Sequence, residues 1–355
     1  MKTEIKQNNR FGWIDYARGI AIILVVYKHA VVGFISSDIP ISDLFFDFQE
    51  MVYNLRMPLF FMLSGVFIEK SLRRRGVKEF VRYKINTIIY PFLIWGGIQI
   101  SIQVIASEYT NSQKSFLDMI YLLYYPRLID PFWFLYTLFF IVIIYALLET
   151  YFKIKKRYLF LLNLAFYFSS FYIKTDILCI NDILFYSIFL TVGILFSKYL
   201  LGKKYHQHFT SAKLFLILGV VVFVGQWYWY TNYKGLVWFT DLSGIDRILF
   251  LPISILGSTF LLQLSFILDK YDLLTILRFI GSHSLYIYVM HLIVTGATRA
   301  VLLKLLGGEA ISLSMILVII SGILMPILIY KITERLKMDF LYQPPKISFL
   351  KQSLQ

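Results

Sequence analysis

Long apolar segments separated by short polar stretches dominate the pattern of the chain. A bilayer core ~30 Å thick needs about 20 mostly apolar residues per helix. Ten segments meet or approach this length, and they lie near 19–36, 51–68, 85–106, 132–152, 158–173, 183–201, 213–230, 247–267, 277–298 and 311–331. The pattern predicts an all-α, polytopic membrane bundle of about ten transmembrane helices. Because the loops between them are short, residues 1–355 are predicted to form a single integral membrane domain.

The basic residues predict how this bundle is oriented. If the N-terminus is cytoplasmic, 26 of the 35 Lys and Arg fall in cytoplasmic segments and seven fall in the opposite segments. Positively charged loops stay in the cytoplasm. The N- and C-termini are therefore both predicted to be cytoplasmic.

Composition excludes several other classes of protein. Hydrophobic residues make up 58% of the chain and charged residues 16%, with a mean hydropathy of +0.69, which fits neither a soluble globular protein nor a disordered chain. The net charge of +14 follows from the loop distribution, so no nucleic-acid partner is expected. The single cysteine and the absence of a third ligand beside His206 and His208 argue against a metal site.

Ionisable residues within the first apolar segment are candidates for function. Arg18 and His29 are eleven residues apart, so they share a helix face with an axial separation of ~16 Å. Asp15 lies one turn before Arg18 and can pair with it. Lys28 is as deep as His29 and needs a wet cavity or an acidic partner. The alternative is an interfacial Arg anchor with a histidine hydrogen-bonded between helices.

Two further segments place polar groups at a similar depth. Arg56 lies about twelve residues from the inner end of its segment, next to Pro58. In the ninth segment Ser284, Tyr288 and His291 share one helix face. Groups at one depth predict a polar site within the membrane. Two alternatives remain open: Arg56 could reach the outer headgroups, and His291 could bond another helix.

The densest charge cluster is the predicted inner loop 69–84, which has seven Lys or Arg and two Glu. Such a cluster fits positive-inside signalling and binding of anionic lipids. It also fits a site for the phosphates of a cytoplasmic ligand, because guanidinium groups bind phosphate oxygens well.

Four sequence motifs together resemble the acyltransferase-3 family of integral membrane acyltransferases. They are DYARGIAIILVVYKH, in which Arg18 and His29 form R-x10-H, RMPLFFMLSGVF from residue 56, PFWFLYTLFF from residue 131 and IGSHSLYIYVMH from residue 280. They occur in the order in which the family has them, and the single-domain, fucose 4-O-acetylase-like type is the most similar.

The resemblance implies an O-acetyltransferase of the bacterial cytoplasmic membrane. It would move an acetyl group from cytoplasmic acetyl-CoA to a hydroxyl of a cell-surface glycan or a lipid-linked sugar, with no metal. The implied catalytic residues are His29, Arg18, Arg56 and His291, and those on the substrate are Asp15, Trp133, Ser284 and Tyr288. The predicted acetyl-CoA contacts are Arg18, Arg73, Arg74, Arg75, Arg82 and Lys84. This chain departs from the family pattern at Lys28, Asn86 and Thr87.

The physical reading of the residues agrees with this reaction. A neutral histidine at His29 can take the proton of an attacking hydroxyl, and Arg56 or Tyr288 can stabilise the oxyanion. The alternative is a transporter or flippase for a polysaccharide or its precursor, since polar residues at mid-membrane also bind transported substrates. The lack of an evident inverted repeat, and of an acidic residue deep in a predicted span, argues against it.

Overall fold

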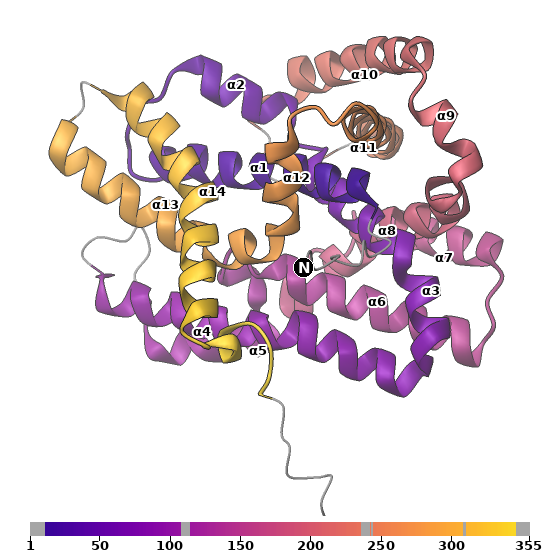
Figure 1. Ribbon diagram of the computed structural model, residues 1–355, viewed down its shortest axis with the longest axis horizontal. Coiled ribbons are helices and arrows are strands. Elements are labelled where there is room, and N and C mark those ends of the chain that lie inside the picture. Colours follow the sequence, from indigo (N-terminus) through magenta and orange to yellow (C-terminus); the bar gives the residue numbers. More distant parts are fainter. Residues whose placement is uncertain (1–10, 108–113, 236–241, 243, 308–309, 346–355) are drawn as a thin grey trace, which may run out of the picture.

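The chain is built from helices joined by short connections (Figure 1). The computed structural model describes residues 11–107, 114–235, 242, 244–307 and 310–345, and no strand occurs in these ranges. The helices are α1 (Gly12–Ile35), α2 (Asp43–Met51), α3 (Arg56–Lys84), α4 (Tyr90–Ile105), α5 (Tyr121–Tyr124), α6 (Trp133–Tyr151), α7 (Lys156–Ser169), α8 (Ile180–Leu201), α9 (His206–Phe209), α10 (Ala212–Tyr233), α11 (Asp246–Lys270), α12 (Thr275–Ser282), α13 (Ser284–Leu306) and α14 (Ile311–Arg335).

The all-α membrane bundle predicted from the sequence is confirmed. Each of the ten predicted spans falls mainly on helix, and eight helical segments of the described chain are long and apolar enough to cross a membrane. Two features explain why the structure has eight such segments while the sequence predicts ten spans. The stretch Asp43–Ile105 is continuous enough to count once although it holds two predicted spans, and α7 has only 14 residues. The number of crossings stays a prediction, and the predicted placement of the termini concerns residues 1–10 and 346–355, outside the described ranges.

Two predicted boundaries differ from the structure. The segment 69–84, expected as a loop, is helical on both sides of Gly76, which has a φ of 71° and turns the chain at this point. Glycine adopts this left-handed conformation without the steric penalty of a Cβ. The ninth predicted span is divided at His283 into α12 and α13. Hydropathy alone does not reveal either break, because the residues on both sides keep a helical pattern.

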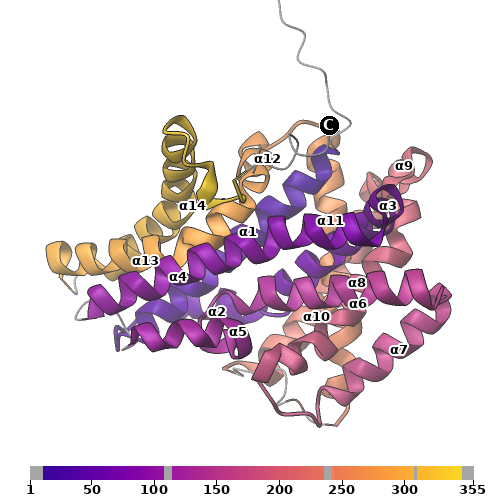
Figure 2. The ribbon, with the colours of Figure 1, turned by 90° about the horizontal axis from the view of Figure 1, so that it is seen from below.

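Helix α1 runs through the middle of the bundle. It contacts α2, α3, α11, α12, α13 and α14, which lie around it in Figure 1. In the perpendicular view α4 and α13 run close together beside α1 (Figure 2), and these two helices are in contact. Polar side chains on α1 are consequently enclosed by several other helices, which gives the candidate site its position.

Glycines allow the closest helix crossings. A Cβ at Gly65 of α3 would lie 2.1 Å from the carbonyl oxygen of Leu190, and one at Gly193 of α8 would lie 2.0 Å from that of Met62. Membrane helices have little hydrophobic drive to associate with each other, so close backbone approach at small residues supplies much of their attraction. This crossing fixes α3 against α8 and thereby places Arg56, at the start of α3, inside the bundle.

Candidate active site

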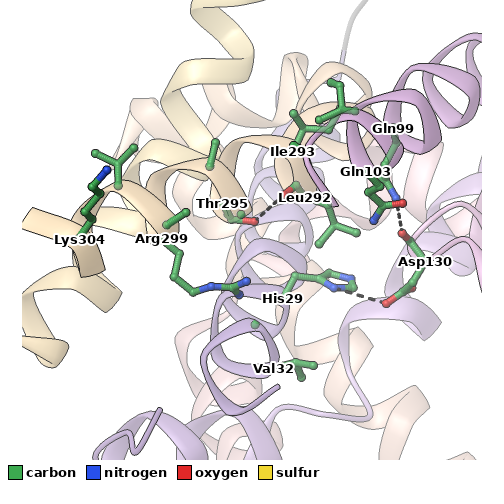
Figure 3. A pocket seen from close by; sticks show the side chains of 17 residues that line it. His29, Val32, Gln99, Gln103, Asp130, Leu292, Ile293, Thr295, Arg299 and Lys304 are labelled. Carbon is green, nitrogen blue, oxygen red and sulfur yellow. Dashed lines mark hydrogen bonds and ion pairs between the residues drawn. The ribbon is translucent and has the colours of Figure 1, made fainter. Parts of the chain in front are cut away.

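His29 and Lys28 of α1 both face one carboxylate, that of Asp130. The Nδ1 atom of His29 is 3.6 Å from Oδ2 of Asp130, and the Nζ atom of Lys28 is 3.7 Å from the same oxygen. Figure 3 shows the His29 ring directed toward Asp130. His29 is 9% exposed, while the Asp130 side chain is 47% exposed. A cavity therefore reaches the carboxylate, and Lys28 has the acidic partner that its depth requires.

Asp130 comes from the segment between α5 and α6, which folds back into the bundle. Its neighbour Arg127 forms a buried ion pair with Asp182 at the start of α8, in which Nε of Arg127 is 2.9 Å from Oδ2 of Asp182. The Arg127 guanidinium also lies 4.2 Å above the ring of Trp133. Burial acts against the charge on Arg127, but the adjacent Asp182 carboxylate outweighs it and raises the pKa of Arg127. These contacts tie the Asp130 segment to two helices.

Removing the carboxylate at this ion pair is expected to destabilise the protein strongly. Asp182→Asn leaves the Arg127 guanidinium buried without a compensating charge, which costs about 3 kcal/mol or more. Thermal unfolding in detergent micelles is the measurement. The double variant Arg127→Met/Asp182→Leu should recover most of the lost stability, because it removes both charges. Equal unfolding temperatures for wild type and Asp182→Asn would contradict the importance of the pair.

His291 of α13 lies beside His29. The two ring centroids are 5.0 Å apart, and His291 is fully buried. Its Nδ1 atom is 2.7 Å from the backbone oxygen of Tyr288, so Nδ1 carries the proton in the tautomer assigned from this contact. Nε2 is then a hydrogen-bond acceptor, and it has no partner among the described residues. His291 thus offers a lone pair next to His29.

One cavity at His29 is rich in cations. This cavity, termed the arginine cavity, has a volume of about 320 Å³.

 The arginine cavity is lined by His29, Asp130 and three cationic side chains, Lys28, Arg56 and Arg127. Arg56 is 5% exposed, and its Nη1 donates to Oε1 of Gln49 at 2.9 Å.

Three other residues predicted from the sequence are placed differently relative to this cavity. Trp133 and Tyr288 line it, and the Tyr288 hydroxyl donates to the backbone oxygen of Pro131. Ser284 lies at the start of α13, seven residues before His291, and lines none of the three cavities considered in this section. The structure thus brings Trp133 and Tyr288 to His29, but not Ser284.

A second cavity at His29, termed the lateral cavity, also reaches Asp130. It has a volume of about 560 Å³ and is bordered by α1, α4 and α13 (Figure 3). His29 and Asp130 line both this cavity and the arginine cavity. His29 is therefore accessible from two cavities. Such access would allow two ligands to contact the same histidine.

The N-terminal part of α1 contributes to a separate basic pocket of about 380 Å³. Asp15 and Arg18 line it together with Arg74 and Arg75 of α3. The side chain of Arg75 is held by the Ser71 hydroxyl at 3.0 Å and lies 4.0 Å from the ring centroid of Tyr83. Because Arg18 and His29 are on the same helix, the basic pocket lies ~16 Å along α1 from His29.

The remaining predicted basic residues do not line this pocket. Arg73 is exposed and pairs with Glu69, and Arg82 is exposed and pairs with Glu79. Lys84, at the end of α3, has its ammonium 5.4 Å from the ring centroid of Phe80. The charge cluster is therefore divided between residues that line the basic pocket and residues that do not.

Reasoning from the sequence missed Asp130. It lies in a segment that reads as an outer loop, far from α1 along the chain, and only the fold brings it to His29. Lys28 was the one available signal, because a lysine at that depth calls for an acidic partner. With Asp130 in place, His29 has what a general base needs: an orienting carboxylate, a buried position and cavities on both sides.

A family model described as an acyltransferase domain, of the acyltransferase-3 type, matches residues 11–331. No curated protein and no solved structure matches the chain.

Proposed function

Because the chain belongs to the acyltransferase-3 family, we propose that it is an O-acetyltransferase of a bacterial cytoplasmic membrane. The donor is acetyl-CoA, and the acceptor is a hydroxyl of a cell-surface glycan or of its lipid-linked precursor. The observation that carries this proposal is the position of His29, which faces Asp130 and lines two cavities.

In the proposed reaction His29 acts as the general base. The acceptor hydroxyl attacks the thioester carbonyl while the imidazole takes its proton, and collapse of the tetrahedral intermediate breaks the carbon–sulfur bond. The proton then passes to the thiolate, so that the products are the ester and CoA. Asp130, on the Nδ1 side, orients the ring and stabilises the imidazolium that forms. The Nδ1–Oδ2 distance is 3.6 Å, and catalytic hydrogen bonds that are long in a substrate-free structure commonly tighten when the substrates bind.

Arg56 is the better of the two predicted oxyanion donors. A guanidinium has five N–H donors, and one of them is used on Gln49. The single hydroxyl proton of Tyr288 is already donated to Pro131. Since oxyanion stabilisation depends on donors aimed at the developing charge, we assign this role to Arg56. Tyr288 instead holds the backbone next to Asp130.

The basic pocket is the proposed site for the phosphates of acetyl-CoA. Arg18, Arg74 and Arg75 present three guanidinium groups there, which suit phosphate oxygens. The ~16 Å between Arg18 and His29 along α1 would be spanned by the thin arm of CoA, which ends in the thioester.

Two adjacent arginines offer a matched test of the donor site. Arg74→Gln removes a charge that lines the pocket, and its expected effect is a rise in the apparent KM for acetyl-CoA of about tenfold, the usual value of a charge-assisted hydrogen bond. Arg73→Gln removes an exposed charge beside it and should change this KM less than twofold. Equal effects of the two variants would contradict the proposed phosphate site.

The proposed function is tested by following the acetyl group. Membranes containing the protein are supplied with acetyl-CoA labelled in the acetyl group and with membrane or surface glycan, and ester-linked label in the glycan is measured. Membranes from cells lacking the protein are the control. We expect label that is released by mild alkali and appears only with the protein. Absence of transfer when both substrates are supplied would refute the proposal.

A further inference from the structure

The lateral cavity is shaped and lined as a binding site. Its volume of about 560 Å³ lies within the range of small-molecule pockets. Apolar side chains of α1, α4 and α13, among them Val32, Ile102 and Leu292, form much of its wall. Most of its polar lining falls into two groups. His29, Asp130, Gln99 and Gln103 lie at one end, while Arg299 and, farther away, Lys304 extend toward the other, as Figure 3 shows. A ligand that enters this cavity would reach the base.

Two glutamines of α4 line the His29 end of the cavity with unused hydrogen-bonding capacity. Gln99 and Gln103 are four residues apart and share a helix face. The Nε2 atom of Gln99 donates to the backbone oxygen of Asp130 at 2.8 Å. The Oε1 atoms of both glutamines are buried and have no partner among the described residues. Since buried amide oxygens are normally hydrogen-bonded, these two suit the hydroxyl groups of a ligand.

Arg299 of α13 places a positive charge close to His29. A Cβ at Gly33 would lie 2.1 Å from Nη1 of Arg299, so the guanidinium rests directly on this glycine of α1. Gly33 follows His29 by four residues, which is about 6 Å along the helix. The charge therefore lies about one helical turn from the base, a separation on the scale of one sugar ring.

The direction of the Arg299 side chain is informative. Arg299 follows His291 by eight residues, about 12 Å along α13, yet its guanidinium lies at Gly33, only one turn beyond His29. An arginine that serves as an interfacial anchor extends toward the headgroups. Arg299 instead reaches back toward His29, as Figure 3 shows. A cation that faces a cavity within the membrane is a candidate substrate-binding group.

We propose that the lateral cavity binds the acceptor and that the acceptor is a sugar with an anionic group. One hydroxyl of the sugar lies at His29, Gln99 and Gln103 bond its neighbouring hydroxyls, and Arg299 binds its phosphate or carboxylate. This inference rests on the proposed acyl transfer for the identity of the ligand as acceptor. Its binding contacts can be tested without any turnover.

The test uses three probes that differ in charge. They are decyl glucoside, which is neutral, decyl glucuronide, which has a carboxylate, and glucosyl decyl phosphate, which has a phosphodiester. Binding to the full chain in lipid nanodiscs is measured at equilibrium without acetyl-CoA. We expect at least one anionic probe to bind about tenfold more tightly than decyl glucoside. A preference for the phosphodiester indicates a lipid-linked sugar phosphate, and one for the carboxylate indicates an acidic sugar of a glycan.

Substitutions locate the source of this preference. Arg299→Gln should bring the affinities of charged and neutral probes within twofold of each other, and Arg299→Lys should retain part of the difference. Gly33→Ala, which displaces the guanidinium without removing it, should weaken the anionic probes selectively. Gln103→Leu should weaken all three. Arg278→Gln is the matched control, because Arg278 pairs with Asp272 and lines none of the three cavities.

The outcomes separate this inference from the proposed function. Equal binding of charged and neutral probes by the wild type, no binding of any probe, or an unchanged preference in folded Arg299→Gln each overturns it. Anion-selective binding that depends on Arg299, together with no acetyl transfer, would support the cavity as a binding site and refute the acyltransferase proposal alone. Acetyl transfer without anion-selective binding would refute only the inference.

Discussion

Replacement of His29 by glutamine is expected to lower acetyl transfer by about 10²- to 10⁴-fold, the usual contribution of a positioned general base. Glutamine has a similar size and can still hydrogen-bond Asp130, but it cannot accept and release a proton at neutral pH. The fall should appear in kcat, because the proton is transferred in the transition state. Initial rates at saturating acetyl-CoA and matched protein levels are the measurement.

A second histidine substitution supplies the control. His206→Gln alters a ring that contacts Phe266 and the backbone oxygen of Leu200, away from all three cavities. Its transfer rate should stay within twofold of the wild type. If His29→Gln is equally active and folded, the base must be another group, and His291 with its unpartnered Nε2 would be the next residue to test.

The parts of the fold that depend on local sequence could be predicted. Apolar length located the helices, and the constant rise per residue placed Arg18 at one end of α1 and His29 deep within it. Arg56 and His291 were expected at a similar depth, and the structure has Arg56 lining a cavity with His29 and has His291 in contact with it. Depth along a helix is a local property, so it follows from counting residues.

The parts that depend on distant contacts could not be predicted. Asp130 is 101 residues from His29 in the chain, and their approach requires the segment before α6 to turn into the bundle and to be held by Arg127 and Asp182. Similarly, Arg74 and Tyr83 line the basic pocket from the two sides of the turn at Gly76, while Arg82, next to Tyr83, does not line it. Neither arrangement follows from the hydrophobic period or the composition of the segment in which it occurs.

Asp130 carries the second large expected effect. Asp130→Asn keeps the size of the side chain and leaves the backbone oxygen that Gln99 uses. It removes the charge that faces Lys28 and His29, so the imidazolium formed in the reaction loses its stabilising partner. We expect kcat to fall by about 10²-fold. This is less than the ~10⁴-fold known for the aspartate of a serine protease triad, because the Asp130 side chain is half exposed and solvent replaces part of the interaction.

A double variant distinguishes an orienting carboxylate from one that only neutralises Lys28. Asp130→Asn alone leaves the Lys28 ammonium without its acidic partner, which by itself could disturb α1. Lys28→Met/Asp130→Asn removes both charges and should restore the unfolding temperature. If Asp130 orients His29, the transfer rate stays low in this double variant, whereas recovery of the rate would show that Asp130 serves the lysine alone. We thus expect the double variant to recover stability but not activity, because the Asp130 carboxylate neutralises Lys28 and separately orients His29.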